Sequence, residues 1–176
     1  MDFKMAVSRG WRMIQLDRSA VREVLGDTDA LVPSLVILAI AGVASAIGSF
    51  NFIGVLYMPI ILPAFYFVCV GLVHLAASAF GGSGSYVSTY NAYGHSLGLL
   101  YWISVIPLLG IFLGFFAMIW GVVMGVVIVE ENYSLSRGKA IVAVLVPMLL
   151  FCVCIGGIMV LFFGGIASLA AFGNAQ

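Results

Sequence analysis

The sequence is most unusual for how little charge it carries. Seven basic and seven acidic side chains make up 8% of its 176 residues, whereas a soluble domain carries roughly 25%. None of them lies between residues 30 and 129. A stretch of this length without formal charge is typical of a chain dissolved in lipid, where charged groups are costly. The composition therefore excludes a soluble domain built around one core.

The sequence also lacks the features of several functional classes. Its formal net charge is zero, which leaves no basic face for phosphates and excludes nucleic acid as a partner. It contains no GxSxG motif, no CxxC pair and no carboxylate pair at membrane depth. Residues 81–85 are rich in glycine but lack the GK[ST] ending of a phosphate-binding loop. We therefore expect no enzymatic activity, no catalytic residue, no cofactor and no bound metal.

Long apolar runs take the place of charge. A helix that crosses a membrane needs about 20 mostly apolar residues. Five segments meet this requirement, at about residues 31–50, 52–80, 86–106, 109–129 and 139–163. We expect an all-α integral membrane protein in which residues 30–176 form a domain with five transmembrane helices.

The basic residues predict how this domain is oriented. All seven lie in segments 1–30 and 130–139, which face the same side of the membrane if there are five spans. Because basic residues collect on the cytoplasmic side, we expect a plasma (inner) membrane protein. Its N-terminus would be cytoplasmic and its C-terminus outside.

The charged N-terminal segment has an amphipathic pattern. Its apolar side includes Phe3, Val7, Gly10, Trp11 and Ile14. The pattern predicts an interfacial helix over residues 1–29, with Asp17 interrupting the apolar side. This helix would be a plain anchor, or a membrane sensor or docking site that uses Trp11 and Arg12. Five acidic residues in this segment are unlike a signal peptide, so we expect the first apolar segment to be retained.

Four polar side chains lie at membrane depth and form the candidate site. His74 lies in the second segment, while Ser88, Asn91 and His95 share one stripe of the third. Such a stripe faces protein or a watered cavity. It would either hydrogen-bond between helices or line a proton relay, metal site or substrate pocket.

Two further patterns suggest contact surfaces. Glu130 and Glu131 precede a polar loop, and Arg137 and Lys139 follow it. Glu130 is the best candidate partner for Lys139 across the turn. The loop is either an ordinary solvated one, since exposed pairs contribute little to stability, or it is ordered by a buried pair. Glycines four residues apart occur as Gly94/Gly98, Gly110/Gly114 and Gly121/Gly125. Their spacing predicts close helix packing, either within the bundle or between copies.

Several short motifs follow one another along the apolar part of the chain. They are His74-Leu75, Gly81-Gly82-Ser83-Gly84-Ser85, Tyr93-Gly94-His95-Ser96, Ile106-Pro107 and Glu130-Glu131-Asn132-Tyr133-Ser134-Leu135-Ser136-Arg137-Gly138-Lys139-Ala140. Their order, over roughly residues 30–160, resembles the prokaryotic branch of the Yip-domain (Ypt-interacting protein) family. The resemblance implies five spans and a cytosolic N-terminus. Eukaryotic members bind Rab-type GTPases, but their longer N-terminal region carries an Asp-Leu-Tyr-Gly-Pro-like motif that this chain lacks.

These observations favour a non-enzymatic membrane scaffold or adaptor. Its partners would be the lipid bilayer, a second copy or another membrane protein. The contact residues would be Trp11, Arg12, Glu130, Glu131, Arg137 and Lys139. The alternative is a small transporter or channel whose polar cavity is lined by His74, Asn91 and His95.

Overall fold

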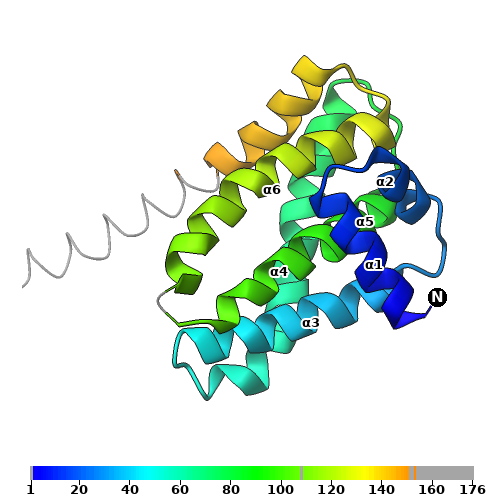
Figure 1. The fold of residues 1–176 in the computed structure, drawn as a ribbon. Coiled ribbons are helices and arrows are strands. Elements are labelled where there is room, and N and C mark those ends of the chain that lie inside the picture. The colour runs from blue at the N-terminus through cyan, green and yellow to red at the C-terminus, as the bar shows by residue number, and fades with distance from the viewer. Residues whose placement is uncertain (1, 108, 151–152, 154–176) are drawn as a thin grey trace, which may run out of the picture.

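The computed structural model describes residues 2–107, 109–150 and 153, and this part of the chain is all helical, without a strand (Figure 1). The helices are α1 (Phe3–Ile14), α2 (Arg18–Leu25), α3 (Leu31–Gly48), α4 (Gly54–Ala79), α5 (Tyr86–Leu100), the 3-10 helix η1 (Tyr101–Val105) and α6 (Leu109–Tyr133). Residues 137–150 are helical as well.

Three helices are long and apolar enough to cross a membrane: Leu31–Gly48, Gly54–Ala79 and Phe112–Tyr133. They correspond to the first, second and fourth expected spans. The expected third span divides into the 15 residues of α5 and the five of η1. The expected fifth span lies outside the described residues from position 151 on, except for residue 153.

One helix end differs from the expectation. The polar residues from Glu130 onward predict a loop, but α6 continues to Tyr133. Glu130 and Glu131 therefore lie in the last turn of α6, and the loop is reduced to residues 134–136. The reason is tertiary: Tyr133 is almost fully buried, so its packing favours the extra turn.

Helix α5 lies at the centre of the bundle. It contacts α1, α2, α3, α4 and α6, and every residue from Thr89 to Gly98 is buried. The surrounding helices instead expose large apolar side chains, such as Val32 on α3, Leu56 on α4 and Phe112 on α6. The polar helix is thus enclosed by protein, and the outer helices present the apolar surface that a bilayer requires.

The N-terminal segment forms two helices where the sequence predicts one. Leu16 adopts a left-handed backbone conformation with φ of 63°, which ends α1 and redirects the chain. Asp17 then caps α2, because its carboxylate accepts hydrogen bonds from the backbone N–H groups of Ser19 and Ala20. The residue that interrupts the apolar pattern is therefore the start signal of a second helix.

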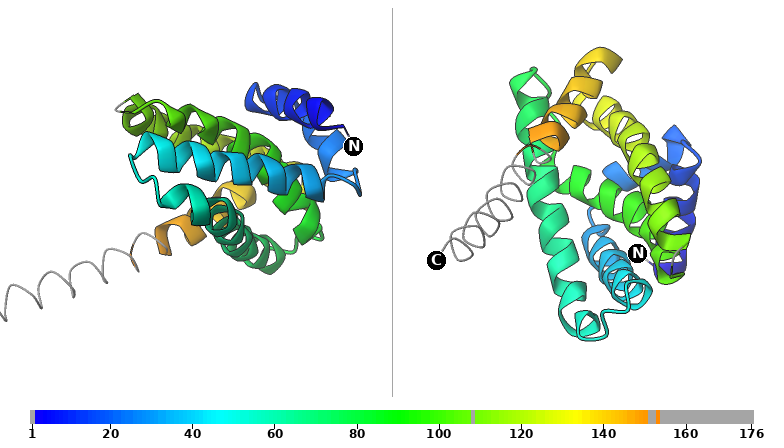
Figure 2. Two further views of the ribbon diagram at one scale, coloured as in Figure 1. Left: turned by 90° about the horizontal axis from the view of Figure 1, so that it is seen from below. Right: turned by 90° about the vertical axis from the view of Figure 1, so that its left-hand side faces the viewer.

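Helix α1 packs against α5 through small residues. Ala6, Gly10 and Met13 are buried, and a Cβ atom at position 10 would overlap the backbone carbonyl of His95. On the next turn, the indole of Trp120 on α6 donates a hydrogen bond of 2.9 Å to the carbonyl of Ile14. Figure 2 shows the result, with α1 and α2 on one side of the bundle and α4 on the other.

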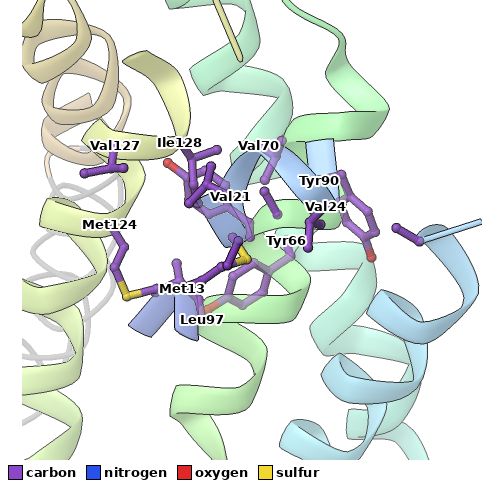
Figure 3. Packing of buried hydrophobic residues seen from close by; sticks show 14 of the residues in the cluster. Met13, Val21, Val24, Tyr66, Val70, Tyr90, Leu97, Met124, Val127 and Ile128 are labelled. Atoms are coloured by element: carbon purple, nitrogen blue, oxygen red, sulfur yellow. The ribbon is translucent and has the colours of Figure 1, made fainter. Parts of the chain in front are cut away.

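Both N-terminal helices contribute to the main hydrophobic cluster (Figure 3). The residues labelled there are Met13, Val21, Val24, Tyr66, Val70, Tyr90, Leu97, Met124, Val127 and Ile128. They come from α1, α2, α4, α5 and α6. The N-terminal helices are therefore part of the folded core, and the face of α1 that remains exposed carries Phe3 and Trp11.

The α1–α5 contact predicts a large effect of one methyl group. Gly10→Ala places its Cβ against backbone that cannot move aside, so we expect a loss of about 1–3 kcal/mol in unfolding free energy. The control is Gly26→Ala, where the added Cβ would lie 3.5 Å from the nearest atom, the carbonyl of Arg22. Thermal unfolding of both variants in detergent measures the difference. Equal Tm values would contradict the close contact.

Candidate functional site

His95 is the centre of the first of two polar networks. It is fully buried, and its Nδ1 lies 2.8 Å from the carbonyl oxygen of Asn91 and 2.9 Å from Ser34 Oγ. Because a carbonyl can only accept, Nδ1 carries the proton. In the neutral ring Nε2 is then the nitrogen with the lone pair, and among the described residues it has no hydrogen-bond partner. Ser34 in turn donates to the carbonyl of Ala30 at 2.7 Å.

Glycine spacing explains how Ser34 reaches this histidine. A Cβ at Gly94 would lie 2.8 Å from that of Ser34, and one at Gly98 would lie 3.0 Å from a methyl carbon of Ile37. The two glycines thus form the side of α5 that faces α3. Their lack of side chains lets the helix backbones approach closely enough for the interhelical hydrogen bond.

The second network contains His74 and joins α4, α5 and α6. His74 Nδ1 lies 2.7 Å from the hydroxyl of Tyr133, which lies 2.9 Å from Thr89 Oγ1. Asn132 donates to the same Thr89 oxygen at 2.7 Å, and Thr89 donates to the carbonyl of Ser85 at 2.8 Å. Sequence reasoning missed Thr89, Asn132 and Tyr133. The only available signal was their polarity next to the apolar segments.

The predicted site residues are therefore divided between two networks. His74 and His95 have different partners, and the half-buried side chain of Ser88 belongs to neither network. A cavity of about 210 Å³ lies between α4, α5, α6 and residues 137–150. It is lined mainly by apolar side chains and by none of the four predicted residues. No group of three potential metal-ligating side chains is found in the described part of the chain.

A set of ion pairs joins α2 to the end of α6. Arg18 contacts Glu130 and lies 2.7 Å from Glu131, and Arg22 lies 3.0 Å from Glu131. We call these four residues the α2–α6 clasp. The glutamate side chains are only 10% and 13% exposed, whereas those of Arg18 and Arg22 are 42% and 61% exposed. The guanidinium groups thus cover the carboxylates.

The clasp corrects the pairing expected from the sequence. Glu130 pairs with Arg18 and with Arg137, whose Nε lies 3.2 Å away, and not with Lys139. The Lys139 ammonium donates to the carbonyl of Phe80 at 3.2 Å. The two predicted contact surfaces, residues 1–29 and 130–139, are therefore joined to each other.

The other predicted contact residues remain near the surface. Trp11 is 59% exposed, while Arg12 forms ion pairs with Asp17 and Glu23 of its own segment.

On α6, Gly125 faces the hydroxyl of Tyr93 and Gly121 faces Leu97 of α5, while Gly114 has no neighbour within 4 Å. The packing around Gly110 lies outside the described part of the chain.

The motif segments quoted above meet in the structure. A Cβ at Gly82 would lie 2.7 Å from the Cβ of Tyr133, and Asn132 donates to the carbonyl of Ser85 at 2.7 Å. The sequence model of the Yip1 domain matches residues 11–159. The chain belongs to the Yip1-domain family. Comparison with curated proteins gives no match, and neither does comparison with solved structures.

The family match confirms the resemblance seen in the motifs and the assignment to membrane proteins. Its range begins at Trp11, so it includes α2 and ends beyond the acidic turn of α6. Both halves of the α2–α6 clasp therefore lie inside the Yip1 domain. The clasp is a contact within the domain and not between the domain and an appended tail.

The clasp predicts that Arg18 contributes more to the stability of the fold than a side chain that is 42% exposed ordinarily does. Arg18→Ala leaves Glu130 with only Arg137 and Glu131 with only Arg22, and both carboxylates remain largely buried. We expect a loss of about 1 kcal/mol in unfolding free energy and faster proteolysis within α2. The control is Arg137→Ala, which removes one bond of a 72% exposed side chain. If Arg137→Ala is the more destabilising variant, the clasp does not hold α2.

The N-terminal carboxylates predict a loss of stability in acid. Hydrogen bonds from Ser19 and Arg12 hold the pKa of Asp17 below its usual value. Burial raises the pKa of Asp27, but hydrogen bonds from Arg9 and from the backbone of Asp29 lower it by a larger amount. The pKa of Asp27 therefore also lies below its usual value. A lowered folded-state pKa gives stability that is present above the unfolded-state pKa, near 4, and is lost as the pH falls through the folded value.

We therefore expect the Tm of the protein to fall as the pH is lowered from 6 to 3. Asp17→Asn keeps a good helix cap but removes the charge, so this variant should have a lower Tm at pH 6 and a smaller dependence on pH. The exposed Asp29 provides the control variant, Asp29→Asn. A wild-type Tm that rises on acidification would contradict the prediction.

Proposed function

We propose that this Yip1-domain protein is a non-enzymatic membrane scaffold or adaptor that binds membrane partners at its cytoplasmic face. Residues 1–29 would form the interfacial part and residues 30–176 the membrane domain, in a plasma (inner) membrane. The support comes from the family, from the arrangement of the helices and from the distribution of charge.

Five spans are compatible with the lengths of the described helices. Three helices are candidate spans already. Helix α5 rises by 1.5 Å and η1 by about 2 Å per residue, so together they extend about 32 Å, close to the 30 Å hydrocarbon core. The apolar residues up to position 163 would complete a fifth span. The N-terminus would then be cytoplasmic and the C-terminus outside, because the basic residues all fall on one side.

The scaffold proposal is carried by one observation. Helix α1 is packed on the bundle, and its outer face exposes two aromatic side chains, Phe3 and Trp11, which we call the aromatic strip. Gly10 and Met13 fix α1 on the bundle, and this leaves Trp11 59% and Phe3 41% exposed. Exposed Trp beside Arg is the composition of interface hot spots. A rigid helix presents these side chains with little loss of entropy on binding. The strip therefore suits contact with another membrane protein or a second copy.

A transporter or channel is less well supported. That alternative needs His74, Asn91 and His95 around one polar cavity. His74 instead bonds to Tyr133, and His95 bonds to Ser34 and the Asn91 carbonyl. Hydrogen bonds of this kind hold neighbouring helices together. They suit a rigid bundle that presents a binding surface better than a polar cavity for transport.

Site-specific photo-crosslinking in native membranes tests the proposal. A photoreactive aromatic amino acid replaces Trp11 in one variant and Met13, which is 2% exposed, in the control. We expect the crosslinker at position 11 to give an intermolecular product of discrete mass. Placing the crosslinker on the partner identified in this way should give the same product. At position 13 we expect only intramolecular products. If position 11 also gives only intramolecular products, this surface binds no protein.

A further inference from the structure

The hydroxyl groups of the tyrosines fall into two sets. The chain has seven tyrosines, and four of them hydrogen-bond through the hydroxyl, namely Tyr57, Tyr86, Tyr90 and Tyr133. The hydroxyls of Tyr66, Tyr93 and Tyr101 have no hydrogen-bond partner in the described part of the chain. A hydroxyl that is kept from water without a partner is costly, so a set of three calls for an explanation.

All three of these tyrosines line the same cavity, the one of about 210 Å³ between α4, α5, α6 and residues 137–150. The rings of Tyr66 on α4 and Tyr101 on η1 pack edge to face, with their centroids 6.3 Å apart. The Tyr93 hydroxyl is fully enclosed, but those of Tyr66 and Tyr101 are not, although only 8% of Tyr66 is exposed. These two hydroxyls are therefore available to a molecule in the cavity.

The rest of the lining indicates the chemistry of that molecule. None of the described residues that line the cavity is charged, so a charged ligand would find no counter-charge. Phe65 adds a fourth aromatic ring to those of the three tyrosines, and such rings pack well against a flat ring. An apolar cavity of about 150 Å³ holds one benzene molecule. The 210 Å³ found here therefore suits a single substituted ring.

The cavity also reaches the apolar outer surface of the bundle. Leu72 on α4 and Met118 on α6 belong to its lining, and both are exposed. Each lies in a helix that is long and apolar enough to cross a membrane. A lipid-soluble ligand can thus enter from the bilayer, and an apolar tail attached to its ring can extend back along the same route.

We propose that this cavity binds a membrane-soluble quinone, that is, a lipid with an uncharged ring that carries carbonyl oxygens. Tyr66 and Tyr101 donate hydrogen bonds to the carbonyl oxygens, and the ring packs among the aromatic side chains. The tail passes Leu72 and Met118 into the bilayer. The proposal concerns binding alone. It adds a ligand to the proposed scaffold and does not depend on the protein contact at Trp11.

Thermal unfolding of the purified full-length protein in mild detergent tests the proposal. The probes are decylubiquinone, whose ring carries carbonyl oxygens, and decylbenzene, which has the same tail on a ring without oxygen. A ligand that binds the folded state raises the Tm, and the dependence of the Tm on ligand concentration reports the affinity. We expect decylubiquinone to raise the Tm clearly more than decylbenzene does at the same concentration.

Matched variants separate the hydrogen bonds from the shape of the cavity. Tyr66→Phe and Tyr101→Phe each remove one unpartnered hydroxyl, so the Tm without ligand should stay at the wild-type value. Each variant should bind decylubiquinone about fivefold more weakly, since one hydrogen bond is lost, and should bind decylbenzene as before. The control is Tyr90→Phe, which removes the hydrogen bond of 3.1 Å to the carbonyl of Pro63. It should lower the Tm without ligand and keep the affinity for decylubiquinone.

Cys69 reports whether the ligand lies in this cavity. Its half-buried side chain belongs to the lining, so N-ethylmaleimide can alkylate it. Replacing Cys152 and Cys154 by serine makes Cys69 the single cysteine of the chain. We expect decylubiquinone to slow the alkylation of Cys69 at the concentrations that raise the Tm.

Three outcomes would overturn the proposal. The first is a Tm that decylubiquinone does not raise, or raises only as much as decylbenzene does. The second is an equal loss of quinone affinity in Tyr66→Phe and Tyr90→Phe. The third is an unchanged alkylation rate of Cys69 when the Tm is raised, which would place the ligand elsewhere. A failed crosslink at Trp11 together with retained quinone binding would contradict the scaffold role alone.

Discussion

Most polar side chains of helix α5 are buried among apolar helices, so they depend on the protein for hydrogen-bond partners. Asn91 Oδ1, the Tyr93 hydroxyl and His95 Nε2 are the fully buried side-chain atoms in the described part of the chain that have none. The requirement for partners places α5 in the middle of the bundle, where it contacts α3, α4, α6 and both N-terminal helices. It also explains the positions of Ser34 and Tyr133, which supply hydroxyl groups to the two polar networks. This polar helix thus determines how the apolar helices around it are arranged.

The N-terminal helices complete this enclosure. Gly10 brings α1 against the backbone of α5 at His95, and α2 adds Val21 and Val24 to the central cluster. The amphipathic pattern of residues 1–29 therefore combines two kinds of apolar surface. One kind packs against protein, and the other, with Trp11, stays exposed. A helical wheel cannot separate the two, because both are apolar and adjacent.

Much of the architecture can be predicted from the sequence because lipid makes simple demands. The apolar runs locate α3, α4 and α6 to within a few residues, except where the burial of Tyr133 extends α6. The sequence does not predict which polar groups meet. Ser34 looks like an ordinary small residue until α3 is placed against Gly94. Likewise, Glu130 has basic neighbours in the sequence, and only the fold shows that Arg18 is a partner. Asp17 could have been identified as a helix cap, since Asp is one of the residues preferred at the N-cap position.

The clasp has a consequence for the order in which the chain assembles. Two carboxylates in the last turn of α6 oppose the negative end of the helix dipole, and Arg18, 112 residues earlier in the chain than Glu130, compensates for this. A ribosome therefore delivers the arginine long before its acidic partners exist. Helix α2 is made early but gains these contacts only once α6 exists, so in a nascent chain it remains available to chaperones or to lipid until α6 has been synthesised.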